Sequence, residues 1–215
     1  MPETKICSVK DEEDFETAVS AAAAALTEGK AAAFPTETVY GLGACISNEK
    51  AVLNIYQIKG RPSEKPLSVL IASAADLEKI AEEIPPEASM LAEKFWPGPL
   101  TIILKKRKDI SDSITAGKDT VGIRIPAHPV ALEIVRRTGP LACPSANTSD
   151  SREPKSATDV LEDLNGKIDI LIDGGETKLQ KPSTIIDLTV SPPKILRKGG
   201  ADITEIKNCI GEILE

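Results

Sequence analysis

Hydrophobic residues along the chain follow two spacings, one helical and one extended. Between residues 48 and 58, for example, Val52, Ile55 and Tyr56 recur every three or four positions and form an apolar stripe. This spacing predicts helices at residues 11–28, 48–58, 74–83, 86–95, 129–137, 156–164 and 202–214. Short β-rich runs predict strands at residues 31–34, 67–72, 100–104, 121–125, 141–143, 168–172, 184–188 and 195–197.

Helical and extended segments alternate, which favours an α/β or α+β fold built on a mixed β-sheet. The 215 residues suit one domain, and neither an internal repeat nor a low-complexity linker divides them. We therefore expect a single domain over residues 1–215, with its core at about residues 12–200.

The composition is that of an ordinary globular protein, with 41% hydrophobic and 27% charged residues. No apolar run approaches the roughly 20 residues that a membrane-spanning helix needs, so we expect a cytoplasmic protein with no membrane partner. The four cysteines are far apart and His128 is the only histidine, which is not the spacing of a zinc site. No metal-ligating residues are expected.

The formal net charge of −7 disfavours binding of long nucleic acid through the overall field. Aromatic residues make up only 3% of the chain and offer few platforms for stacking bases. Local basic groups therefore matter more than the total charge.

Residues typical of binding sites gather between the predicted elements rather than within them. These segments are rich in Gly, Pro, hydroxyl groups or arginine, and loops held by a rigid scaffold often carry binding residues. The segments are residues 35–43, 59–62, 96–101, 121–126, 144–147, 182–184 and 195–197.

Lys59 and Arg61 are two positions apart. In an extended segment their side chains would point to the same face and present both cations to one anion. The planar fork of arginine and the compact charge of lysine both suit phosphate. The alternative is a solvated basic turn, which this triplet alone does not exclude.

Arg124 lies within an apolar run, where it should face the opposite way from Ile123 and Ile125. Charged side chains are almost never buried without a partner. Arg124 therefore either faces solvent on an open sheet face or holds an anion.

Ser145 and Asn147 follow the predicted strand at 141–143. Small polar side chains at the carboxyl end of a strand can line the crevice where α/β sheets bind ligands. The alternative is a turn that forms hydrogen bonds within itself. The same two interpretations apply to Thr36 and Thr38.

Taken together and in this order, the segments resemble the YrdC/Sua5 family of threonylcarbamoyl-adenylate synthases. The resemblance covers roughly residues 12–200. It is carried by P-T-E-T-V-Y-G-L-G, K-x-R, W-P-G-P-L-T, V-G-I-R-I-P, P-S-A-N, S-T-I-I-D-L and I-L-R. Each motif is weak alone, and it is their joint occurrence that is specific.

The resemblance implies a twisted, partly curled α/β fold with a large basic cavity. It also implies a nucleotidyltransferase that condenses L-threonine, bicarbonate and ATP to threonylcarbamoyl-adenylate and pyrophosphate, for the threonylcarbamoyl-adenosine modification of tRNA. The implied catalytic pair is Lys59 and Arg61. The implied ATP-binding residues are Lys59, Arg61, Ser145, Asn147, Ser183 and Arg197, and the implied threonine-binding residues are Thr36 and Arg124.

The chain departs from the family pattern after the S-A-N motif. The family usually reads close to x-S-G-x-P-S there, with a serine near the ATP, whereas residues 148–156 read T-S-D-S-R-E-P-K-S. Asp150 thus replaces a glycine, an insertion is expected, and the source of the serine hydroxyl is left open between Ser156 and another residue. The longer family members carry an extra C-terminal domain, which this chain is expected to lack.

Mg²⁺ is expected to accompany ATP, held mainly by phosphate oxygens and water. The resemblance leaves open whether the product is handed directly to the transferase that modifies tRNA, and whether RNA is bound weakly. The alternative function is an RNA-binding module for tRNA or double-stranded RNA, without catalysis.

Overall fold

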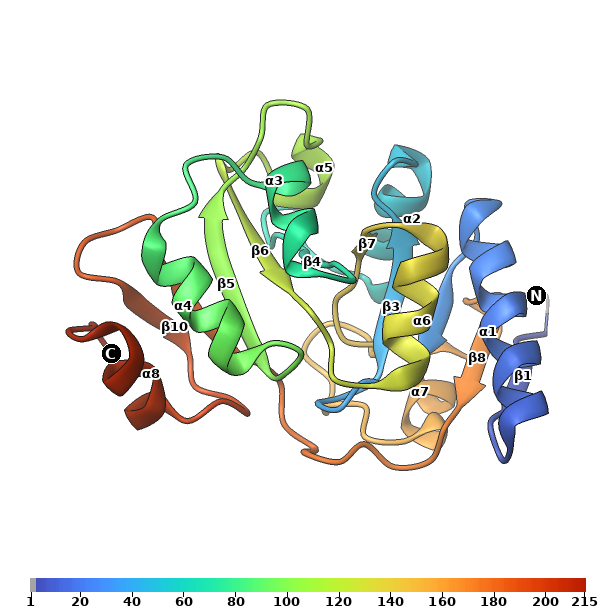
Figure 1. Ribbon diagram of the computed structural model, residues 1–215. Coiled ribbons are helices and arrows are strands. Elements are labelled where there is room, and N and C mark those ends of the chain that lie inside the picture. Colours follow the sequence, from blue (N-terminus) through green and yellow to red (C-terminus); the bar gives the residue numbers. More distant parts are fainter. Residues whose placement is uncertain (1–2) are drawn as a thin grey trace.

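A computed structural model describes residues 3–215 of the chain, and ten strands within this range form one open, mixed sheet (Figure 1). The strand order is β1-β8-β2-β3-β7-β4-β6-β5-β9-β10, with both parallel and antiparallel pairs. The strands are β1 (Lys5–Ser8), β2 (Ala32–Phe34), β3 (Gly41–Cys45), β4 (Ser68–Leu70), β5 (Leu100–Lys105), β6 (Thr120–Arg124), β7 (Leu141–Ala142), β8 (Ile170–Asp173), β9 (Thr184–Asp187) and β10 (Lys194–Arg197).

Helices flank this sheet, and no helix in residues 3–215 has the length and apolar character to cross a bilayer. They are α1 (Glu12–Thr27), α2 (Glu49–Lys59), the 3₁₀-helix η1 (Ala74–Asp76), α3 (Leu77–Ile80), α4 (Pro86–Phe95), α5 (Asp112–Thr115), α6 (Pro129–Thr138), α7 (Ala157–Leu164) and α8 (Ile203–Ile210).

Side chains of β2 and β8 alternate between two layers of the core. Phe34 and Ile172 pack with α1 and α6 in one apolar cluster, whereas Ala33 and Leu171 belong to a second cluster with α2 and α7. Successive residues of a strand point to opposite faces, so both faces of this half of the sheet are covered by helices.

The other half of the sheet packs against α4 and α8. Leu91 of α4 and Ile206 of α8 are fully buried with Ile102 of β5 and Ile186 of β9. Between the two halves lie the short strands β4 and β7, which join them through hydrogen bonds to β6 and β3 (Figure 1).

The mixed α/β fold predicted from the alternating pattern is confirmed, with three elements that the pattern missed. These are β1, β3 and α5. β1 is mostly exposed, and the sequence of β3, Gly-Leu-Gly-Ala-Cys, has few strand-favouring residues. Two predicted helices are shorter than expected: residues 74–83 form only η1 and α3, and the last helix ends at Ile210.

Candidate active site

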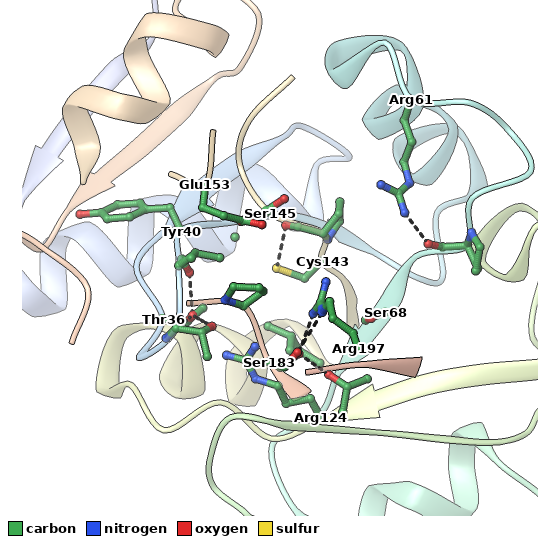
Figure 2. Close-up of a pocket in the computed structure, with 18 residues that line it drawn as sticks. Thr36, Tyr40, Arg61, Ser68, Arg124, Cys143, Ser145, Glu153, Ser183 and Arg197 are labelled. Carbon is green, nitrogen blue, oxygen red and sulfur yellow. Dashed lines mark hydrogen bonds between the residues drawn. The ribbon is translucent and has the colours of Figure 1, made fainter. Parts of the chain in front are cut away.

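A cavity opens where loops from both halves of the sheet meet (Figure 2). Ser68 and Leu70 both line it and point the same way from β4, so the cavity lies over one face of that short central strand. Its charged lining consists of Arg61, Arg124, Glu153 and Arg197. Six of the eight residues singled out from the sequence line it, namely Thr36, Arg61, Arg124, Ser145, Ser183 and Arg197.

Lys59 and Asn147 are the two that do not line the cavity, and both are buried beside its wall. Lys59 is the last residue of α2, and Gly60 ends the helix with a positive φ of 57°, a conformation that glycine adopts without strain. The expectation of an extended segment presenting Lys59 and Arg61 to one face was therefore wrong. The helix end turns the two side chains to different surroundings.

The ammonium group of Lys59 is fully engaged by the Ser145–Asn147 turn. Its Nζ donates to the main-chain carbonyl of Ser145 at 2.6 Å, to the carbonyl of Asn147, and to Oδ1 of Asn147 at 3.2 Å. Burial, reinforced by the charge of Arg61, lowers the pKa of Lys59 to about 8. Lys59 thus holds the turn that carries Ser145.

Asn147 connects this turn to the loop that follows. Its Nδ2 donates to the carbonyls of Ser151 and Arg152, both at 3.1 Å, while its Oδ1 accepts from Oγ of Ser145 at 2.6 Å. The self-bonded turn considered from the sequence is therefore present, and it still leaves Ser145 in the cavity wall.

Arg61 reaches the cavity from the loop after α2. Its Nε donates to the carbonyl of Lys65 at 3.0 Å and its Nη2 to that of Pro66 at 2.8 Å. These bonds fix the plane of the guanidinium group, and the group has further N–H donors for an anion.

Arg124 is buried, and its guanidinium group is paired with a carboxylate. Its Nη2 donates to Oε2 of Glu37 at 3.0 Å, and both side chains are more than nine-tenths buried. Nε of Arg124 and Oε1 of Glu37 have no described hydrogen-bond partner. The same Glu37 oxygen accepts from the main-chain N–H of Ala127 at 3.0 Å, so Glu37 anchors the guanidinium at the cavity.

Ser183 and Arg197 lie together at the side of the cavity formed by β9 and β10. Arg197 donates from Nε to the carbonyl of Ser183 at 2.9 Å and from Nη2 to its Oγ at 3.0 Å (Figure 2). Oγ of Ser183 is also 2.7 Å from Oγ1 of Thr101. Burial lowers the pKa of Arg197, which still leaves it a cation near neutrality.

Thr36 is held by its own loop between β2 and β3. Its hydroxyl donates to the carbonyl of Val39 at 2.6 Å and lies 2.8 Å from the hydroxyl of Thr38. Tyr40 in the same loop is tied to the turn after β8, since its hydroxyl donates to Gly175 at 2.7 Å. These contacts make this side of the cavity rigid.

The sequence did not point to Glu37, Cys143 or Glu153 as site residues. Glu37 lies inside the P-T-E-T motif. The sequence alone gives no sign that it lies beside Arg124, because the two residues are brought together only by the fold. Cys143 lines the cavity, but burial raises the pKa of its thiol to about 12, so it is not a thiolate nucleophile near neutral pH.

The segment that departs from the family pattern also contributes to the site. Asp150 takes the position of the usual glycine with a φ of 68°, a left-handed conformation that glycine favours and aspartate tolerates. Ser156 caps α7, where its side chain accepts from the N–H of Asp159, and it does not line the cavity. Glu153 is the residue of this segment that does line it.

The sequence model of the Sua5/YciO/YrdC protein family, which carries the description "Telomere recombination", matches residues 24–199. The chain is 53% identical over 193 residues to a threonylcarbamoyl-AMP synthase of Pyrococcus abyssi, covering 89% of this chain and 57% of that relative. It therefore spans less than three-fifths of the relative's length.

Two solved structures have closely similar folds. The structure of P. abyssi Sua5 complexed with L-threonine superimposes with a TM-score of 0.94 at 48% identity, covering 99% of this chain and 62% of that one. E. coli YciO superimposes with a TM-score of 0.83 at 25% identity, covering 96% of this chain and 100% of that one.

Proposed function

The chain belongs to the Sua5/YciO/YrdC family, and on this premise we propose that it condenses L-threonine, bicarbonate and ATP into threonylcarbamoyl-adenylate and pyrophosphate. The similarity to a threonylcarbamoyl-AMP synthase supports the reaction. The product would serve the threonylcarbamoyl-adenosine modification of tRNA, through a transferase that receives it.

The observation that carries this proposal is the convergence of three arginines on one cavity. Arg61 follows α2, Arg124 ends β6 and Arg197 ends β10, and the fold brings all three into the same lining. Such a concentration of cations suits an anionic substrate with several phosphates.

Threonine would lie at the side formed by Arg124 and Thr36. A guanidinium held by Glu37 at 3.0 Å keeps its orientation, and Arg124 lines the cavity where it would pair with the carboxylate of the amino acid. The neighbouring structure complexed with L-threonine supports a threonine site in this fold.

ATP would lie at the side formed by Arg61, Ser145, Ser183 and Arg197. Hydroxyl and guanidinium donors are grouped there, and hydrogen bonds fix both Ser145 and Ser183. Lys59 would act through the turn that it holds, as a positioning residue rather than as a phosphate ligand.

The chemistry needs little covalent help from the protein. The threonine nitrogen forms a bond to the carbon of bicarbonate with loss of water, or to CO₂, and gives up a proton to become a carbamate. A carbamate oxygen then attacks the α-phosphorus of ATP, the bond to the bridging oxygen breaks, and pyrophosphate leaves. Correct positioning alone contributes about 7–11 kcal/mol to such reactions, and fixed cations stabilise the developing phosphate charge.

Mg²⁺ would enter with ATP. No cluster of three or more His, Cys, Asp or Glu side chains in residues 3–215 is arranged to hold a metal ion. The phosphate oxygens and water would therefore supply most of the ligands.

Pyrophosphate release in substrate-omission experiments tests the proposal. With ATP and Mg²⁺ present, release should require both threonine and bicarbonate, and replacing threonine by leucine should reduce it to the background. Equal release without threonine or without bicarbonate would contradict the proposed reaction.

A further inference from the structure

Glu153 is the one acidic side chain among the described residues that line the cavity. Its Oε2 is shielded from solvent and has no hydrogen-bond donor among residues 3–215, and the side chain forms no ion pair with Arg61, Arg124 or Arg197. Buried carboxylate oxygens are normally satisfied. An unsatisfied one in a ligand cavity therefore indicates a partner that arrives with the ligand.

The loop around Glu153 is fixed on both sides. Before it, the carbonyl of Arg152 accepts from Nδ2 of Asn147 at 3.1 Å. After it, the carbonyl of Pro154 accepts from the N–H of Tyr40 at 2.8 Å. Figure 2 shows the side chain between Tyr40 and Ser145 at the edge of the cavity. The backbone on both sides of Glu153 is thus held at the edge of the cavity.

A triphosphate in the cavity would bring further negative charge close to this carboxylate, which favours a cation between the two in addition to the lining arginines. Like charges within a few ångströms repel, and a carboxylate beside phosphate oxygens is instead the usual environment of Mg²⁺. We propose that Glu153 is the protein ligand of the Mg²⁺ ion that enters with ATP, an inference that rests on the proposed function.

The surroundings determine how such a site would behave. No group of three or more His, Cys, Asp or Glu side chains surrounds Glu153 among residues 3–215, so the protein alone does not form a complete metal site. The phosphate oxygens must complete it, so the protein should bind the metal tightly only with the nucleotide. The ammonium group of threonine is the other cation among the substrates, and its pairing with Glu153 is the competing assignment.

Calorimetric titration of ATP into the Glu153→Gln variant tests the proposal. In Mg²⁺, the variant should bind ATP at least about tenfold more weakly than wild type. A loss of about tenfold is the lower end of what is measured in metal affinity when a residue next to the metal ligands is replaced. In EDTA it should bind ATP as well as wild type or better, because a negative charge has been removed. Glu176→Gln, an exposed carboxylate outside the cavity lining, is the matched control and should match wild type in both buffers.

Two results would overturn the assignment. One is an equal loss of ATP affinity with and without Mg²⁺. The other is a loss of threonine affinity with the Mg²⁺ dependence unchanged, which would assign Glu153 to the substrate ammonium. A wild-type protein that binds no ATP in either buffer would overturn the proposed function as well, so the two failures are distinguishable.

The wild-type protein offers a second test that does not depend on folding of the variant. Mn²⁺ occupies the same oxygen sites as Mg²⁺ and is paramagnetic. With ATP bound and glutamate labelled with ¹³C at its side-chain carboxyl, electron–nuclear double resonance should show a ¹³C coupling of a directly ligated carboxylate. Absence of this coupling in the ATP complex would overturn the proposal.

Discussion

The Nζ atom of Lys59 donates a hydrogen bond of 2.6 Å to the main-chain carbonyl of Ser145, a residue far away in the sequence. The ammonium group therefore organises the turn that lines the cavity. Because the Lys59 main-chain carbonyl also accepts from the N–H of Ser149 at 2.8 Å, the end of α2 and the loop after β7 form one unit.

Replacing Lys59 by methionine should weaken ATP binding roughly 10- to 100-fold, since a hydrogen bond to a charged group contributes about 1.5–3 kcal/mol. The same change should increase amide exchange at Ser149 as the turn loosens. Titration calorimetry and hydrogen exchange would measure the two effects. Lys50→Met, an exposed lysine of α2, is the control. Unchanged ATP affinity in Lys59→Met would contradict this role.

The pKa of Lys59, lowered to about 8 mainly by burial, predicts a pH dependence. Above this pH the amine becomes neutral and has only two N–H donors for the three acceptors of the turn. ATP affinity, measured between pH 7 and 10, should therefore fall as the pH rises through about 8. Lys59→Met should show no such step, and a step of the same size in that variant would assign the titration to another group.

Replacing Arg124 by lysine should raise the threonine concentration needed for half-maximal rate by roughly 10- to 100-fold, because an ammonium group cannot reproduce the charged guanidinium contact proposed for the threonine carboxylate. The ATP concentration needed for half-maximal rate should change little. Lysine keeps a cation beside Glu37, so the buried carboxylate retains a partner. Steady-state rates with varied threonine and then varied ATP would measure the two concentrations separately. A change confined to the ATP requirement would count against the assignment.

Removing Glu37 tests the stability of the buried pair rather than the chemistry. Glu37→Ala leaves Arg124 as an uncompensated buried charge, which typically costs about 3–5 kcal/mol of unfolding free energy. The exposed pair of Glu28 and Lys30 is the comparison, where Glu28→Ala should have a much smaller effect because solvent screens the pair. Urea unfolding followed by circular dichroism measures both. Equal small losses would show that the Glu37 pair contributes little.

The sequence pattern predicted most of the fold, because apolar spacing along a helix or strand is a local property. The prediction missed elements in which the apolar spacing is weak. β1 buries little of its surface, and β3 is built of small residues whose fit depends on the neighbouring Phe34 ring, which lies close to Gly43. The end of α2 at Lys59 was placed one residue early, and that difference changed the direction of its side chain.

The candidate site was predicted in part. The motifs brought Arg61, Arg124, Ser145 and Arg197 to notice as polar groups in apolar or loop surroundings, and the fold places them in one cavity. The partners of these residues could not be predicted, because they lie far apart in sequence and meet only through the sheet order. Glu153 was missed for a different reason, since an exposed loop carboxylate and a cavity carboxylate look identical in a sequence.

The most direct test of the whole account is mass spectrometry of the product formed from threonine, Mg²⁺-ATP and bicarbonate in unlabelled and ¹³C-labelled form. We predict a threonine-dependent adenylate whose mass rises by one unit with the labelled bicarbonate. Turnover of ATP that yields no such species, or an adenylate without the label, would contradict the proposed reaction.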